Sequence, residues 1–287
     1  MTVTQNVRFN IADIPSEAID ATISGGIGFG WAWRDAFWKM GAGVLRLTGK
    51  NTYGGGGTIA NGEGTTQLRE GTLLVDNDST VYGSGTGNSL VRVNGGTVLG
   101  GTGRIGGLTE EVKTWSGTGN GSNTRVTVKG SATAQAVVWP GTIDAETGAH
   151  VNGTLTVGID EILPGEEVLR TLHHPVTFGD YSTLKIGFGE GKNQFDALVV
   201  NGAVDISATG TKLELLASDA SGKVRGGTYT ILSATDGITG DFAQVDAQSK
   251  GWKVNKVMGK VTTEEGEADA VVALTATIPG SFMVIIR

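Results

Sequence analysis

Three histidines are the residues in this chain most worth testing for metal or acid–base chemistry. His173 and His174 are adjacent. Adjacent side chains in a strand point to opposite faces, so these two imidazoles cannot bind one metal ion together. His150 is distant from them in the sequence. We therefore expect no metal site and interpret residues 173–174 as a loop pair.

A second candidate is the carboxylate pair Asp76 and Asp78, which follows the apolar run GTLLV. Carboxylates two residues apart can share a face and bind Ca²⁺ together with backbone oxygens. A pair placed directly after a strand is also typical of a solvated turn, and the turn is what we expect here. No site residues for a metal, a cofactor or catalysis are therefore predicted.

The sequence also gives little support for hydrolytic activity or nucleotide binding. Glycoside hydrolysis needs two carboxyl groups that converge on one groove. The acidic pairs of this chain are instead adjacent residues, which are typical of solvated faces: Glu110 and Glu111, Glu166 and Glu167, and Glu264 and Glu265. The segment GTGRIG (101–106) matches G-x-G-x-x-G, but a dinucleotide site also needs a helix that begins there. With no recognisable nucleophile elbow or triad, we predict that the protein is not an enzyme.

The composition argues against several classes of protein. The chain has 287 residues, with 48 glycines, 5 prolines and a net charge of −7. Collagen would need glycine at every third position and abundant proline. The mild acidity gives no electrostatic reason to bind nucleic acid or an anionic membrane. Valine, isoleucine, leucine and threonine recur in strand-like alternation, which argues against disorder.

Export to the cell exterior is compatible with the sequence. Cysteine is absent, so stability must come from burial and backbone hydrogen bonds. No run approaches the roughly 20 apolar residues of a membrane span. The first 15 residues lack the basic and apolar regions of a signal peptide, so an exported form would be a mature fragment. We expect an extracellular or bacterial cell-surface location.

One strand pattern recurs along most of the chain. Short runs with β-branched residues at alternate positions end in Asn-Gly or Gly-Gly, which favour turns with positive φ. The clearest runs are 71–78, 89–107, 124–132, 152–158, 182–189, 196–206 and 211–216. One such coil cannot bury its inner face alone, so coils must stack on one another. The fold expected is all-β: a right-handed parallel β-helix, or β-solenoid, with irregular terminal segments.

Other segments interrupt this pattern. Residues 159–181 are richer in charge and are expected to form a loop or excursion that leads into the next coils. Residues 227–242 are expected to form two strands around a turn. The segment 262–269 is predicted to be an exposed hairpin tip, and helical periodicity is almost absent, with 108–115 the best candidate.

The two ends of the chain carry the most apolar segments. Trp31, Trp33, Phe37 and Trp38 lie within eight positions. They indicate either a terminal cap over the core or an exposed aromatic patch for a partner subunit or a sugar. The last strand, SFMVIIR (281–287), is apolar on both faces and must be buried or paired.

The segment 41–76 carries a family signature. It resembles the passenger-associated transport repeat, also called the autotransporter-associated β-strand repeat. The matching parts are the Gly-rich lead Gly41 to Gly43, the strand Leu45 to Gly49, the turn Asn51 to Tyr53, Gly56 to Thr58, and the closing strand Gly71 to Leu73. This resemblance, which extends over roughly 41–278, implies a right-handed β-helix displayed outside a bacterial cell and no single enzymatic activity.

Together these observations predict three parts: N-terminal strands with an aromatic cap or interface segment (1–40), a β-solenoid (41–278) and a C-terminal apolar assembly strand (279–287). The function expected is that of a non-enzymatic surface stalk or fibre subunit that assembles head to tail into a homo-oligomer or filament. The predicted interface residues are Trp31, Trp33, Phe37, Trp38, Phe282, Val284, Ile285 and Ile286. The alternatives are a carbohydrate-binding or polysaccharide-active β-helix that contacts a surface glycan, and an autotransporter passenger fragment that acts as an adhesin.

Overall fold

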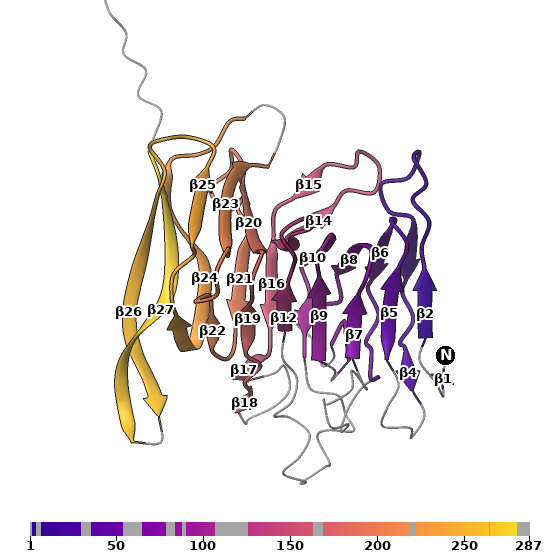
Figure 1. Ribbon diagram of the computed structural model, residues 1–287, viewed down its shortest axis with the longest axis horizontal. Helices are drawn as coiled ribbons and strands as arrows, with labels where there is room; N and C mark the ends of the chain where they lie inside the picture. Colours follow the sequence, from indigo (N-terminus) through magenta and orange to yellow (C-terminus); the bar gives the residue numbers. More distant parts are fainter. Residues whose placement is uncertain are drawn as a thin grey trace, which may run out of the picture.

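The computed structural model describes residues 2–3, 7–29, 36–53, 65–78, 84–87, 90–106, 126–162, 169–218, 222–263 and 265–279. Within these ranges the protein is all-β, without a helix (Figure 1). Consequently, no helix in the described part is long and apolar enough to cross a membrane.

An eight-stranded sheet of parallel neighbours runs along the molecule. In spatial order its strands are β25 (Gln244–Ala247), β23 (Lys212–Ala217), β20 (Ser182–Phe188), β13 (Ala136–Pro140), β10 (Thr97–Gly101), β8 (Gly71–Val75), β6 (Val44–Leu47) and β3 (Ala21–Ile23). Every pairing in this order is parallel.

A thirteen-stranded sheet runs beside it. Its main path is β11 (Arg104–Ile105), β16 (Thr154–Val157), β21 (Ala197–Val200), β24 (Gly227–Thr239), β22 (Val204–Asp205), β19 (Val176–Phe178), β12 (Val126–Lys129), β9 (Leu90–Asn94), β7 (Thr65–Leu68), β5 (Phe37–Met40) and β2 (Val7–Asn10). These pairings are also parallel. β27 (Gly266–Ile278) joins β24 antiparallel, and β26 (Lys253–Thr263) joins β27 antiparallel.

Three two-stranded pairs complete the structure. They are β1 (Thr2–Val3) with β4 (Gly28–Phe29), β14 (Thr142–Ile143) with β15 (His150–Val151), and β17 (Ile159–Ile162) with β18 (Leu169–Leu172). The β17–β18 hairpin confirms the excursion predicted within 159–181. The hairpin predicted at 262–269 is confirmed by β26 and β27, where Thr263 pairs with Gly266.

From β5 to β10 the chain alternates between the two large sheets, so each of these strands pairs with strands from other coils and not with the next strand in sequence. We call residues that pair laterally across successive strands a column. One column of the eight-stranded sheet contains Leu45, Leu73, Leu99, Val138, Leu184 and Leu213. All six side chains are buried in one hydrophobic core. Each such side chain contributes about 1.5–3 kcal/mol when removed from water, so stacking supplies the stability that one short strand lacks.

Glycine is required where these strands turn closely past one another. Gly101 has φ 122° at the end of β10, and a Cβ there would lie 2.0 Å from the Val75 carbonyl oxygen. Gly71 has φ 70° at the start of β8, where a Cβ would meet the Gly41 carbonyl oxygen at 2.5 Å. A side chain at either position would force the adjacent strands apart, so both positions require glycine.

One expectation changes in the C-terminal part of the fold. The segment 227–242 does not form two strands around a turn, because β24 continues from Gly227 to Thr239. It bends at register shifts and changes its parallel neighbour from β21 to β22. At the other end, β2, β3 and β5 pair within the two large sheets. These parts of 1–40 therefore continue the same sheets as the residues after 41.

Candidate functional site

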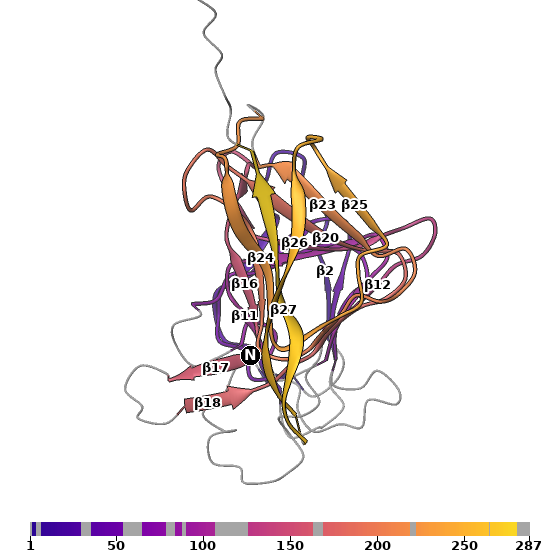
Figure 2. The ribbon, with the colours of Figure 1, turned by 90° about the vertical axis from the view of Figure 1, so that its left-hand side faces the viewer.

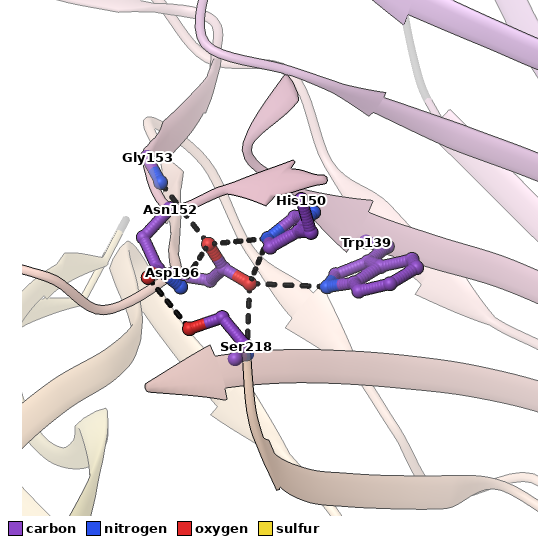
Figure 3. Close-up of polar contacts among 7 residues, drawn as sticks. Trp139, His150, Asn152, Gly153, Asp196 and Ser218 are labelled. Carbon is purple, nitrogen blue, oxygen red and sulfur yellow. Dashed lines mark hydrogen bonds and ion pairs between the residues drawn. The ribbon is translucent and has the colours of Figure 1, made fainter. Parts of the chain in front are cut away.

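The most concentrated polar cluster surrounds the Asp196 carboxylate, which lies immediately before β21 (Figure 3). Its side chain is fully buried. Oδ2 accepts hydrogen bonds from Gly187 N at 2.7 Å and Trp139 Nε1 at 3.1 Å. Oδ1 accepts from Gly153 N at 3.0 Å and Asn152 Nδ2 at 3.1 Å.

His150 provides the fifth donor to this carboxylate. Its Nε2 lies 2.8 Å from Oδ2 and 3.0 Å from Oδ1 of Asp196. Because an ionised carboxylate can only accept, His150 Nε2 must carry the proton and donate it in these contacts. The imidazole stacks on the indole of Trp139, with ring centroids 4.2 Å apart. On that indole also lies the Lys185 ammonium, 3.8 Å from the ring centroid.

Two glycines allow the strands to approach Asp196 closely. At Gly141, which has φ 96° after β13, a Cβ would lie 2.6 Å from His150 Cε1 and 2.8 Å from Asp196 Oδ1. At Gly187 in β20, a Cβ would lie 2.9 Å from Asp196 Oδ2. Neither position has room for a side chain, so glycine at both positions leaves the space that the Asp196 carboxylate occupies.

Residues 141–153, which we call the strap, leave β13, form the β14–β15 hairpin and return to β16. In Figure 1 the strap extends from β13 across the upper end of the sheet toward β8 and β6. Its return end is attached to Asp196 through His150, Asn152 and Gly153.

A second polar network attaches the outgoing end of the strap. Arg46 Nη2 on β6 donates to the Ile143 carbonyl oxygen at 2.5 Å and to Thr142 Oγ1 at 3.0 Å. Thr142 Oγ1 donates to Asp76 Oδ2 at 2.5 Å. Arg46 Nε also forms an ion pair with that oxygen at 2.9 Å, and Thr102 N donates to Asp76 Oδ1 at 2.9 Å. The strap is therefore fastened at both ends.

The geometry of the Asp196 cluster does not support nucleophilic catalysis. A Ser–His–Asp triad needs a serine hydroxyl bonded to the histidine nitrogen that faces away from the aspartate. Ser218 Oγ instead donates to Asn152 Oδ1 at 2.7 Å (Figure 3). All five donors converge on a carboxylate without solvent exposure, and this arrangement is typical of a structural anchor.

The candidates identified from sequence are placed as follows. His173 is exposed, with its Nδ1 2.7 Å from Asp236 Oδ2, whereas His174 is buried, as expected if the two side chains face opposite sides. Asp76 is not a solvated turn residue, because the Arg46 guanidinium and Thr142 enclose it and leave 9% of its side chain exposed. GTGRIG joins β10 to β11 and opens no helix.

The predicted interface residues fall into two groups. Phe37 is fully buried between the rings of Phe9 and Tyr53, at centroid distances of 4.8 and 5.3 Å, so it belongs to the core and not to a surface. Trp38 is partly exposed, but the guanidiniums of Arg8 and Arg69 cover its ring. The others lie outside the described residues: Trp31, Trp33, Phe282, Val284, Ile285 and Ile286.

Within the described part of the chain, no group of three or more histidine, aspartate and glutamate side chains is placed to hold a metal ion. Sequence reasoning missed the His150–Asp196 contact, because 46 residues separate the partners and no motif links them. The only local signal was an isolated acid immediately before the apolar run ALVV (197–200).

Comparisons with known proteins leave the family open. No protein-family model matches the chain. A search of curated proteins likewise found no match.

Proposed function

We propose that the chain is a right-handed parallel β-helix that serves as a non-enzymatic extracellular stalk or fibre subunit and assembles head to tail. Its main support is the set of stacked columns. Each contains one residue from every strand of a parallel sheet, with neighbouring strands about 4.8 Å apart. Many backbone hydrogen bonds together hold such an array against stretching. A molecular spacer needs this resistance.

The two ends of the array differ in a way that favours directional assembly. At the C-terminal end β27 and β26 cover β24 antiparallel. β26 has a bulge between Val257 and Met258 and carries Lys253, Lys256 and Lys260. Bulges and edge lysines discourage the addition of another strand.

The N-terminal end is less protected. Among the described strands, β2 pairs only with β5 and β3 only with β6. The inward side chains Phe9 and Ile23 are only partly buried there, whereas Phe37 and Leu47 in the next strands are fully buried. An open parallel edge beside incompletely covered apolar side chains is suited to accept a strand from another molecule.

We assign the donor strand to residues 281–286, whose sequence SFMVII is apolar after Ser281. This segment of one molecule would pair with the β2 edge of the next, and repetition of the contact gives an open filament. Trp31 and Trp33 precede β5 in the chain and are proposed to contribute to the acceptor end.

Electron microscopy of purified protein at increasing concentration tests this function. We expect filaments from the full chain and monomers after deletion of residues 280–287. A second variant, Phe9→Lys, places a charge at the acceptor end. Mixing the two variants should give heterodimers, because each retains one functional end. Filaments from the deletion variant, or the absence of concentration-dependent assembly by the full chain, would disprove the proposal.

The second candidate function is binding of a surface glycan, as in an adhesin. It is favoured by a row of cations on the outer face of the thirteen-stranded sheet, which includes Arg8 and Arg92.

A further inference from the structure

The outer face of the thirteen-stranded sheet carries a row of cations near its N-terminal end. Arg8, Trp38, Gln67 and Arg92 pair laterally on β2, β5, β7 and β9. Arg8, Trp38 and Arg92 are more exposed than the residues on either side of them, so they belong to the outward row. Gln67 is buried, and its lateral pairing with Trp38 and Arg92 places it in the same row. Figure 1 shows these four strands side by side.

A second outward row adds two more cations. Arg69 follows β7 directly, and Lys129 on β12 pairs with Asn94 on β9. Both cations are exposed. We call Arg8, Trp38, Arg69, Arg92 and Lys129 together the basic strip.

Trp38 organises the strip by holding two of the arginines. The Arg8 Cζ lies 4.7 Å from the Trp38 ring centroid and the Arg69 Cζ lies 3.9 Å from it. One comes from the strand before β5 in the sheet and the other from the strand after it. Arg69 also donates from Nε and Nη2 to Gln67 Oε1, at 3.2 and 3.1 Å. These contacts fix the guanidinium planes before any ligand arrives, which reduces the entropy lost on binding.

No carboxylate neutralises the strip within the described part of the chain. The outward residues of β2, β5, β7, β9 and β12 include no aspartate or glutamate. The nearest acid in sequence, Glu70, accepts from Gly41 N at 3.0 Å. The first acid reached along the row is Asp205 on β22, which accepts from Ser207.

An unneutralised cationic strip is unexpected on a chain with a net charge of −7. Three lysines elsewhere on the surface each have an acidic partner: Lys212 pairs with Asp246 at 2.7 Å, Lys256 with Asp241 at 2.6 Å and Lys260 with Asp269 at 2.8 Å. The strip thus concentrates unused positive charge on one face.

We propose that the basic strip binds a linear acidic polysaccharide along the axis of the stacked strands. Three strand spacings separate Arg8 from Arg92, about 14 Å in total. An extended sugar polymer with regularly repeated carboxylate or sulfate groups can contact several guanidiniums at once through charge-assisted hydrogen bonds. This inference deepens the second candidate function, because it names the glycan class and the face that binds it, and does not depend on filament assembly.

Charge density and the position of Trp38 favour an acidic polysaccharide over nucleic acid. Duplex DNA carries one negative charge per about 1.7 Å of its axis, whereas the strip presents at most one or two cations per strand, about 4.8 Å apart. Single-stranded nucleic acid is bound by stacking bases on free aromatic faces, and guanidiniums cover the ring of Trp38.

The test is calorimetric titration of the full chain with polygalacturonate, chondroitin sulfate and neutral dextran at low salt. We expect at least one acidic polymer to bind, dextran not to bind, and the affinity to fall at least tenfold at 0.5 M NaCl. Arg8→Gln, Arg69→Gln and Arg92→Gln combined should reduce the affinity at least tenfold. Arg92→Gln alone, which leaves the contacts with Trp38 intact, should reduce it severalfold.

The matched control combines Lys223→Gln, Lys256→Gln and Lys260→Gln, which also removes three positive charges. It should retain the affinity within about twofold. Equal losses in the two triple variants would show a net-charge effect and overturn the proposal, as would binding of duplex DNA as tight as that of either acidic polymer. The variant lacking residues 280–287 should bind the polymer unchanged, so failure of this inference is distinguishable from failure of filament assembly.

Discussion

The outer face of the eight-stranded sheet and the N-terminal part of the outer face of the thirteen-stranded sheet use charge in opposite ways. On the eight-stranded sheet, Arg46 bonds with Asp76, and Lys212 pairs with Asp246. The hydrogen bond from Lys212 lowers the pKa of the Asp246 carboxyl and the same contact raises the pKa of Lys212. On the thirteen-stranded sheet, Arg8 and Arg92 have no acidic partner among the described residues. The paired charges attach this protein's own segments, whereas Arg8 and Arg92 attach no acidic segment in the part of the chain that the structure describes.

The largest effect is expected from Asp196→Ala. The change leaves five donors without their acceptor, and loss of one partner from a buried charged cluster costs about 3–5 kcal/mol. Urea unfolding should show this loss, whereas the exposed control Glu190→Ala should change stability by less than about 0.5 kcal/mol. A loss below about 1 kcal/mol for Asp196→Ala would mean that the cluster does not anchor the strap.

A smaller effect concerns Lys39, a cation on the inward side of the strands that carry the basic strip. Its Nζ donates to the carbonyl oxygens of Met40, Gly41 and Glu70, at 3.1, 2.7 and 3.0 Å. Burial lowers its pKa from 10.5 to about 8. The unfolded chain therefore binds more protons between pH 8 and 10.5, so this group makes stability rise with pH in that interval.

Comparison with Lys39→Met measures that contribution. Relative to the variant, the wild-type protein should gain on the order of 2 kcal/mol between pH 8 and pH 10. Urea titrations of both proteins at each pH give the difference, because their other titrating groups are the same. A difference that stays constant with pH would show that Lys39 titrates alike in both states.

The next effect concerns the outgoing end of the strap. Arg46→Met should remove the contacts with Thr142, Ile143 and Asp76 and cost about 1–2 kcal/mol. Hydrogen exchange should accelerate at residues 142–151 while the buried strand β10 stays protected. Equal acceleration in both segments would instead indicate global loss of structure.

The smallest effect on stability is expected on the basic strip. Arg92→Gln should change the free energy of unfolding by less than about 0.5 kcal/mol, since no partner within the described part of the chain is lost. Urea unfolding measures it beside Arg46→Met. If Arg92→Gln lowered the free energy of unfolding more than Arg46→Met, the charges of the thirteen-stranded sheet would matter more for stability than those of the eight-stranded sheet, contrary to expectation.

Much of the strand pattern follows from local sequence. The runs at 71–78 and 182–189 contain β8 and β20, and the run at 211–216 covers β23 except for its last residue, Ala217. In these runs β-branched and leucine residues recur between turns, as is typical of strands. The continuity of β24 could not be predicted: Thr-Asp-Gly at 235–237 is a turn signal, yet pairing with β21, β22 and β27 keeps the strand extended.

The polar sites were less predictable than the strands. The sequence around Asp76 does not distinguish it from other acidic residues that follow a strand. Its partner Arg46 lies on a different strand, β6. The basic strip is equally hidden, because Arg8, Arg69 and Arg92 are separated by long intervals and become neighbours only through the register of β2, β7 and β9. Such proximity depends on long-range pairing, and a single sequence does not show it.

The strap shows how much extra sequence this architecture tolerates. The thirteen residues of the strap, 141–153, lie between β13 and β16 and do not interrupt the column from Leu99 through Val138 to Leu184. Its tip at residues 145–148 is exposed, with the ends of the hairpin fastened below it. A foreign epitope grafted at that tip would be presented at a fixed height on an otherwise unaltered rod, so the protein offers a natural carrier for peptide cargo.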